Sequence, residues 1–363
     1  METAVQSLPP GNGDYSVLNV DLAHGEVKGA ASMGPPPVGS EDDHVMFTLE
    51  TFVTMMTTIV CVVGNALILV VASWTSAFDN FNRCYLYSLT SADLLMGLFV
   101  TPFCIFNTMY GKFIFSSDMF CCVEAYLMTL FIMVSMICMT YMNVDHYVAV
   151  RKPDRYGVMM SFNRSLCWIV LTWIIATSFC CPPLFSMQRA FYYREAFICI
   201  IDSRYQQAYF MTVMLLVTLP VVVAILVTSR YLFTTAFQDQ KKFYVKVYED
   251  FSERSWNYYI SFVISSLFLV TWLPFTVVRL IEHNSQWRRE DIPRELHFFI
   301  VWFGLSNCFT KFLVYLLMSP RFRKGLREVC GLEEPREYAL CQTQCNSSES
   351  ISSNIIIDPV QPK

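Results

Sequence analysis

Long runs of apolar residues, separated by short polar segments, dominate the hydrophobic pattern of this chain. An α-helix rises 1.5 Å per residue, so about 20 apolar residues cross the roughly 30 Å hydrocarbon core of a bilayer. The pattern therefore predicts an all-α membrane protein whose fold is a seven-transmembrane helix bundle. The expected spans are residues 46–73, 85–109, 123–150, 166–185, 209–233, 259–281 and 296–318.

Polar residues and prolines inside these spans predict irregular places in the helices. Asn65 and Asp93 lie well inside the first and second spans, where a polar side chain is costly and faces a polar interior. Pro102, Pro220 and Pro274 each remove a backbone donor and should kink or break their helices. Between the fourth and fifth spans, segment 189–204 is rich in aromatic and β-branched residues and predicts a small hairpin.

The composition excludes a soluble globular protein, because 54% of the residues are hydrophobic and 15% are charged, against about 25% charged in soluble domains. Basic residues gather on one set of connections, which the positive-inside rule makes cytoplasmic. They are Arg83, Arg151, Lys152, Arg155, Arg164, Lys241, Lys242, Lys246, Arg254, Arg321, Arg323, Lys324 and Arg327. We therefore expect a multi-pass protein of the cell membrane with an extracellular N-terminus and a cytoplasmic C-terminus.

The regions outside the spans are polar. Residues 1–44 combine prolines, glycines and acidic residues, which predicts a disordered extracellular tail before the seven-transmembrane domain at 45–318. Segment 319–330 places Phe322 and Leu326 on one face among cations, which predicts an amphipathic helix on the membrane surface. Cys330, at its end, is a candidate for palmitoylation. Residues 331–363 are expected to form a disordered cytoplasmic tail.

Several short motifs agree with this topology. The third span runs into Asp145-His146-Tyr147, the sixth contains Trp272-Leu273-Pro274, and the seventh contains Tyr315 near its end. Together with Gly64-Asn65 in the first span and Ser88-Leu89-Thr90-Ser91-Ala92-Asp93-Leu94 in the second, they resemble the rhodopsin-like G-protein-coupled receptors over about residues 46–330. The match has departures: His146 replaces the family's arginine, and Lys311-Phe312 replaces its Asn-Pro.

The resemblance implies functional residues at matching positions. It implies a disulfide from Cys199 to Cys121, with Cys122 as a neighbouring rival. It assigns the signalling switch to Asp145, His146, Tyr147, Phe268, Trp272, Pro274 and Tyr315. It lines the ligand cleft with Glu124, Met128, Thr129, Ile132, Ile201, Thr212, Trp272, Phe275, Thr276, Arg279 and Trp302.

The predicted cleft does not suit a monoamine. Met128 stands where biogenic-amine receptors have an aspartate, and Glu124, one turn away, is only a partial substitute. The other cleft residues are mostly apolar, with Arg279 near the mouth, so a lipid or peptide with an acidic group fits better. Alternatively, Arg279 pairs only with Glu282 at the membrane edge.

At the position of the family's buried sodium ion, the resemblance places Asp93, Ser135, Asn307 and Lys311 beside Trp272. A lysine at mid-membrane needs an anion, and Asp93 is the nearest candidate on a facing helix. We expect an ion pair between them, although Lys311 could instead extend to the membrane surface.

The expected function is that of a receptor passing an extracellular signal to heterotrimeric G proteins, with arrestin as a possible further partner and the bilayer around it. With His146 in place of arginine, basal activity is a further expectation, and a non-signalling scaffold is one alternative. A secondary transporter is another, although such folds usually show paired halves. The sequence contains no motif of an enzyme, and we expect no catalytic residue, metal, cofactor or nucleic-acid partner.

Overall fold

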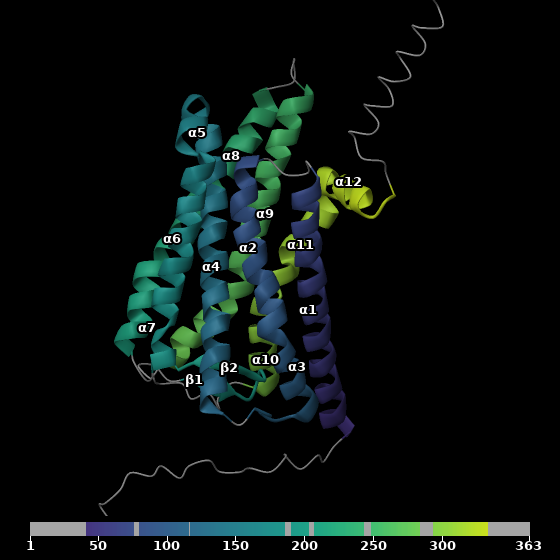
Figure 1. Cartoon of the computed structure of the whole chain (residues 1–363), viewed down its shortest axis with the longest axis vertical. Helices are drawn as coiled ribbons and strands as arrows, with labels where there is room; N and C mark the ends of the chain where they lie inside the picture. Colours follow the sequence, from purple (N-terminus) through teal and green to yellow (C-terminus); the bar gives the residue numbers. More distant parts are fainter. Residues whose placement is uncertain are drawn as a thin grey trace, which may run out of the picture. The chain divides into compact units, whose positions relative to one another are not determined.

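The computed structural model describes residues 41–75, 80–115, 117–185, 190–202, 207–242, 248–283 and 293–332. Helices account for nearly all of them, and Figure 1 shows the long helices running beside one another. The α-helices are α1 (Glu41–Trp74), α2 (Asn80–Phe99), α3 (Thr101–Tyr110), α4 (Asp118–Arg151), α5 (Pro153–Met159), α6 (Phe162–Cys180), α7 (Gln207–Val213), α8 (Leu219–Lys242), α9 (Tyr248–His283), α10 (Arg294–Leu305), α11 (Asn307–Met318) and α12 (Pro320–Val329). The shorter elements are the 3-10 helix η1 (Pro182–Phe185), the π-helix η2 (Met214–Thr218) and the strands β1 (Ala190–Tyr193) and β2 (Ile198–Ile201).

The predicted spans are present. Within the described ranges, six helical stretches are long and apolar enough to cross a membrane, and the bent pair α10 and α11 supplies a seventh. The second span consists of α2 and α3, and the fifth of α7, η2 and α8.

Two predicted prolines lie next to breaks in their helices. The junction of α2 and α3 falls at Val100, so Pro102 occupies the first turn of α3, where its missing N–H costs nothing. The π-helical turn η2 ends two residues before Pro220, because proline cannot complete the regular hydrogen-bond ladder of the preceding turn. Pro274, by contrast, lies inside the continuous helix α9.

The seventh span corrects the expectation of one helix over 296–318. It bends by 53° between α10 and α11. The break falls at Ser306, two residues after Gly304, a small-residue pair of the kind that commonly kinks helices. Ser306 Oγ donates to the Phe303 carbonyl at 2.7 Å, and Thr310 Oγ1 donates to the Ser306 carbonyl at 2.9 Å, so side chains bond backbone oxygens around the bend.

The helix α4 is the centre of the bundle. It packs against α2, α6, α8 and α9 along its length and against both strands at one end. Its buried side chains include many methionines and small residues, which fill irregular space between helices. Polar side chains also join it to its neighbours. Cys138 Sγ of α4 donates to Ser88 Oγ of α2, and Trp173 Nε1 of α6 donates to the same hydroxyl oxygen.

The predicted hairpin is confirmed. Strands β1 and β2 pair antiparallel with Tyr192 opposite Cys199, and Cys199 forms a disulfide with Cys121 of α4. Cys122, the rival partner, is a free thiol. Figure 1 shows this hairpin at one end of the bundle, here called the hairpin end, and α12 at the other, the α12 end.

The predicted amphipathic helix is α12, and it packs on α1 and α11. Ser319 Oγ caps it by accepting the Phe322 N–H at 3.2 Å, and Phe322 is fully buried beside Phe312 and Tyr315. The two predicted disordered tails fall almost entirely outside the described residues. The side chains of Glu253, Arg254 and Glu282 also lie outside them.

Candidate functional site

A cavity of about 530 Å³ lies between α4, β2, the fifth span and α9. That volume is typical of sites for small molecules. Its lining is predominantly apolar, with Arg279 contributing a positive charge. The lining residues are Met128, Thr129, Ile132, Met133, Met136, Ile200, Ile201, Tyr209, Val213, Met214, Thr218, Val222, Leu226, Phe268, Leu269, Val270, Trp272, Leu273, Phe275, Thr276 and Arg279.

Most residues of the predicted ligand set line this cavity. Those that do are Met128, Thr129, Ile132, Ile201, Trp272, Phe275, Thr276 and Arg279. Phe268 and Trp272 of the predicted switch also face it, and Trp272 makes an edge contact with the Phe275 ring at 5.6 Å between centroids. Gly304 lets the indole approach α10, because a Cβ at this position would lie 3.2 Å from the Trp272 ring.

Three predicted ligand residues lie elsewhere. Glu124 is buried beneath the hairpin, where its Oε1 accepts the Cys199 N–H at 3.5 Å and the Cys104 thiol at 3.6 Å. Thr212 is exposed on the outside of α7, and its hydroxyl donates to the Ala208 carbonyl of the same helix. Trp302 is buried, and its Nε1 donates to the Ala196 carbonyl at 3.2 Å.

The hairpin is anchored to several helices at once. Asn107 Nδ2 of α3 donates to the Phe197 carbonyl at 3.4 Å, and Tyr193 is hydrogen-bonded to His297 of α10. Phe197 holds a positive φ of 58° in the tight turn and is nevertheless buried. Backbone strain at a bulky residue persists where the surrounding structure determines it. The hairpin therefore forms a fixed cover over the end of the bundle.

At the α12 end, the triplet that ends the third span is held by its neighbours. The Asp145 carboxylate accepts the Tyr156 hydroxyl of α5 at 3.0 and 3.1 Å to its two oxygens. Tyr147 makes an edge contact with Tyr231 of α8, and His146 is buried.

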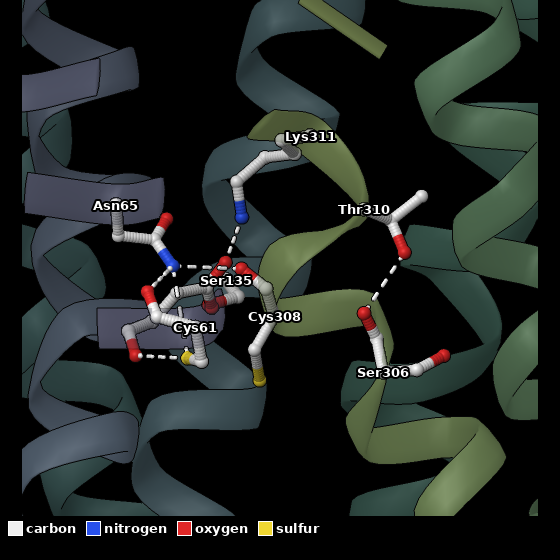
Figure 2. A network of polar contacts seen from close by, with 8 residues as sticks. Cys61, Asn65, Ser135, Ser306, Cys308, Thr310 and Lys311 are labelled. Atoms are coloured by element: carbon white, nitrogen blue, oxygen red, sulfur yellow. Dashed lines mark hydrogen bonds and ion pairs between the residues drawn. The ribbon is translucent and has the colours of Figure 1, made fainter. Parts of the chain in front are cut away.

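Three of the residues predicted around the sodium position, Lys311, Asp93 and Ser135, belong to a buried polar network (Figure 2). Lys311 Nζ forms an ion pair with Asp93 Oδ2, and Ser135 Oγ donates to Asp93 Oδ1 at 2.6 Å. Lys311 and Asp93 are 1% and 2% exposed, so the structure contradicts the alternative of a lysine extended to the membrane surface. Asn307 is also buried, but within the described part of the chain its Oδ1 has no hydrogen-bond partner.

The same region joins the first and seventh spans. Asn65 Nδ2 donates to the Cys61 and Cys308 carbonyls, both at 2.8 Å, as Figure 2 shows. Gly64 lies against the Phe312 side chain, where an added Cβ would come within 2.8 Å of the ring. The Gly64-Asn65 pair thus provides close approach and a hydrogen bond at one helix crossing.

A buried hydrogen bond between α4 and α9 is among the contacts that the sequence pattern did not predict. Asn143 Nδ2 of α4 donates to Ser265 Oγ of α9 at 2.7 Å, and both residues are fully buried. Asn143 lies two residues before Asp145, and its position in an apolar span was the signal that could have revealed it.

A model of the 7 transmembrane receptor (rhodopsin family) matches residues 64–315. The chain belongs to this family. Its fold agrees with that membership in the number of apolar spans. It also has the disulfide and the buried ion pair that the resemblance led us to expect. Among its relatives, "G-protein coupled receptor 52" of Bos taurus is 25% identical over 328 residues, covering 85% of each chain. "Melatonin receptor type 1A" of Ovis aries is 24% identical over 364 residues, covering 98% of this chain and 92% of the relative. "Probable G-protein coupled receptor 21" of Mus musculus is 22% identical, covering 78% and 83%.

The chain is therefore a G-protein-coupled receptor and a multi-pass membrane protein. Membership of the family implies signalling through G proteins rather than catalysis.

Proposed function

We propose that this receptor is activated by an amphipathic ligand with an apolar body and an acidic group, held in the cavity between α4 and α9. The hairpin end faces outward and the α12 end meets the G protein and arrestin. The observation that carries the proposal is the apolar lining, which includes Met128 and has Arg279 as its charged residue.

The lining argues against a monoamine. A protonated amine needs a carboxylate within a few ångströms to offset its desolvation. Glu124, the sequence candidate, is buried under the hairpin and does not line the cavity. The position of Arg279 favours a ligand of the opposite charge.

A receptor assay tests this ligand class. Cells expressing the full chain would be exposed to dopamine, serotonin and long-chain fatty acids, with cyclic AMP and calcium as readouts. We expect a response to the fatty acids and none to the amines. In Ile132→Trp, a bulky ring would fill the cavity and abolish the response, whereas Val123→Trp, on an exposed face of α4, would retain it. Sub-micromolar activation by dopamine or serotonin would overturn the proposal.

We also propose that the receptor couples weakly to its G protein at the α12 end and signals to some extent without ligand. The family's arginine is a long, forked cation that reaches the G protein. His146 is shorter and buried, which supports a reduced contact with the G protein.

A further inference from the structure

The wall of the cavity between α8 and α9 reaches the outside of the bundle. Leu226, Val270 and Leu273 all line the cavity, yet these residues are 53%, 56% and 61% exposed. Side chains that face both the cavity and the surface mark an opening through the wall. Here these three residues are called the side opening.

The side opening lies at the level of the hydrocarbon core. Leu226 belongs to the membrane span Met211–Thr234, and Val270 and Leu273 fall near the middle of the span Tyr259–Ile281. The π-helical turn η2 contributes Met214 and Thr218 to the same cavity. In the described part of the chain, α8 packs on α9, and the contact of α9 with the rest of the fifth span, α7 and η2, is marginal at most. The side opening, at the depth of the two spans' middles, therefore faces the lipid tails.

The hairpin end of the cavity is covered. Ile200 and Ile201 of β2 form part of the lining. The disulfide between Cys121 and Cys199 ties this strand to α4, and Arg279 of α9 donates to the Ile201 carbonyl at 2.7 Å. Among the described residues, β2 is thus held on both sides of the cavity, by a covalent bond and by a charge-assisted hydrogen bond.

We propose that the ligand is a single-chain lipid with an acidic headgroup, which enters from the bilayer through the side opening. Its hydrocarbon chain occupies the apolar cavity, and its acidic group approaches Arg279 at the covered end. This inference rests on the proposed function, because it takes the cavity as the ligand site and adds the ligand's source and route. An apolar chain then passes from one apolar environment to another without crossing water.

Labelling kinetics test the route. The purified full-length receptor, in nanodiscs of phosphatidylcholine, would be exposed to a long-chain fatty acid carrying a mid-chain diazirine and irradiated at intervals. Leu226→Trp and Leu273→Trp narrow the side opening, and Leu273→Phe is a milder variant. Val227→Trp and Val277→Trp are matched controls, because these residues are also exposed on α8 and α9 but do not line the cavity.

We expect labelling of cavity residues to become about tenfold slower in the narrowed variants, with the controls unchanged. The rate is the readout for the route, because Leu226 and Leu273 also line the cavity and their variants change its volume as well as its opening. Equal rates in narrowed and control variants, or a lower final extent at an unchanged rate, would refute the side route.

Two further arms separate this inference from the proposed function. Ile132→Trp should abolish cavity labelling, and persistence of labelling in that variant would refute the cavity as the ligand site. A fatty alcohol of the same length should label at a lower final extent than the acid. Equal labelling by both probes in the wild type would refute the acidic headgroup. A melting temperature for each variant shows that it is folded.

Discussion

At the scale of single residues, the buried pair of Lys311 and Asp93 is the most consequential feature. Both are nearly inaccessible, and Ser135 supplies a further donor to the carboxylate. Removing one partner of such a pair leaves an uncompensated charge in a medium of low dielectric constant. The lysine ammonium can therefore serve as a tethered cation at the position where the family resemblance implies a sodium ion.

This role predicts how the protein responds to sodium. Wild-type receptor should melt at the same temperature in sodium chloride and in choline chloride. Lys311→Asn should lose about 3 to 5 kcal/mol of stability and become sodium-sensitive, because Asp93 then lacks a cation. Lys112→Asn, at an exposed loop position, should behave as the wild type. Selective stabilisation of the wild type by sodium would contradict the role.

At the scale of elements, the hydrogen bond between Asn143 and Ser265 joins the third and sixth spans. Asn143 also donates to the Met139 carbonyl of its own helix, which orients its amide. The side chain of Arg254, in the first turns of α9, lies outside the described residues. The amide and hydroxyl therefore provide a polar constraint on α9 without formal charge.

Breaking this bond should raise basal signalling. A net hydrogen bond of about 1 kcal/mol corresponds to roughly a fivefold shift of a two-state equilibrium. Asn143→Ala and Ser265→Ala should each increase ligand-independent signalling by about that factor, and the double variant should add little more. Thr140→Ala is the control, because its hydroxyl bonds the Met136 carbonyl of α4 itself. Unchanged or reduced basal signalling in both variants would exclude this constraint.

At the scale of the whole molecule, the two ends of the bundle differ in construction. The hairpin end is held by the disulfide and by the hydrogen bond from Trp302 Nε1 to the Ala196 carbonyl. An ion pair of 2.8 Å also joins Arg294 to the buried Glu50. The α12 end has a buried His146 and an amphipathic helix, α12, capped by Ser319.

The identity of residue 146 should set the strength of coupling. In cells matched for surface expression, His146→Arg should raise maximal cyclic AMP or calcium responses, because a guanidinium is longer and always charged. His146→Ala should leave a weak response. Cells with empty vector provide the baseline. Strong wild-type coupling that neither substitution alters would show that residue 146 does not limit signalling.

The sequence by itself determined the number of spans, the hairpin segment and the partner of the buried lysine. These follow from local quantities, namely the length of each apolar run, β-branched and aromatic composition, and the cost of an unpaired charge in a membrane. The family resemblance added the disulfide and most of the cavity lining.

Only the tertiary structure decided which face of each helix points inward. In a membrane, lipid-facing and core-facing surfaces are both apolar, so periodicity does not distinguish them. For that reason Thr212 turned out to face outward, Glu124 to lie beneath the hairpin, and Asn143 to meet Ser265. The bend at Ser306 and the side opening between α8 and α9 likewise depend on packing between distant segments, which the order of residues along the chain does not reveal.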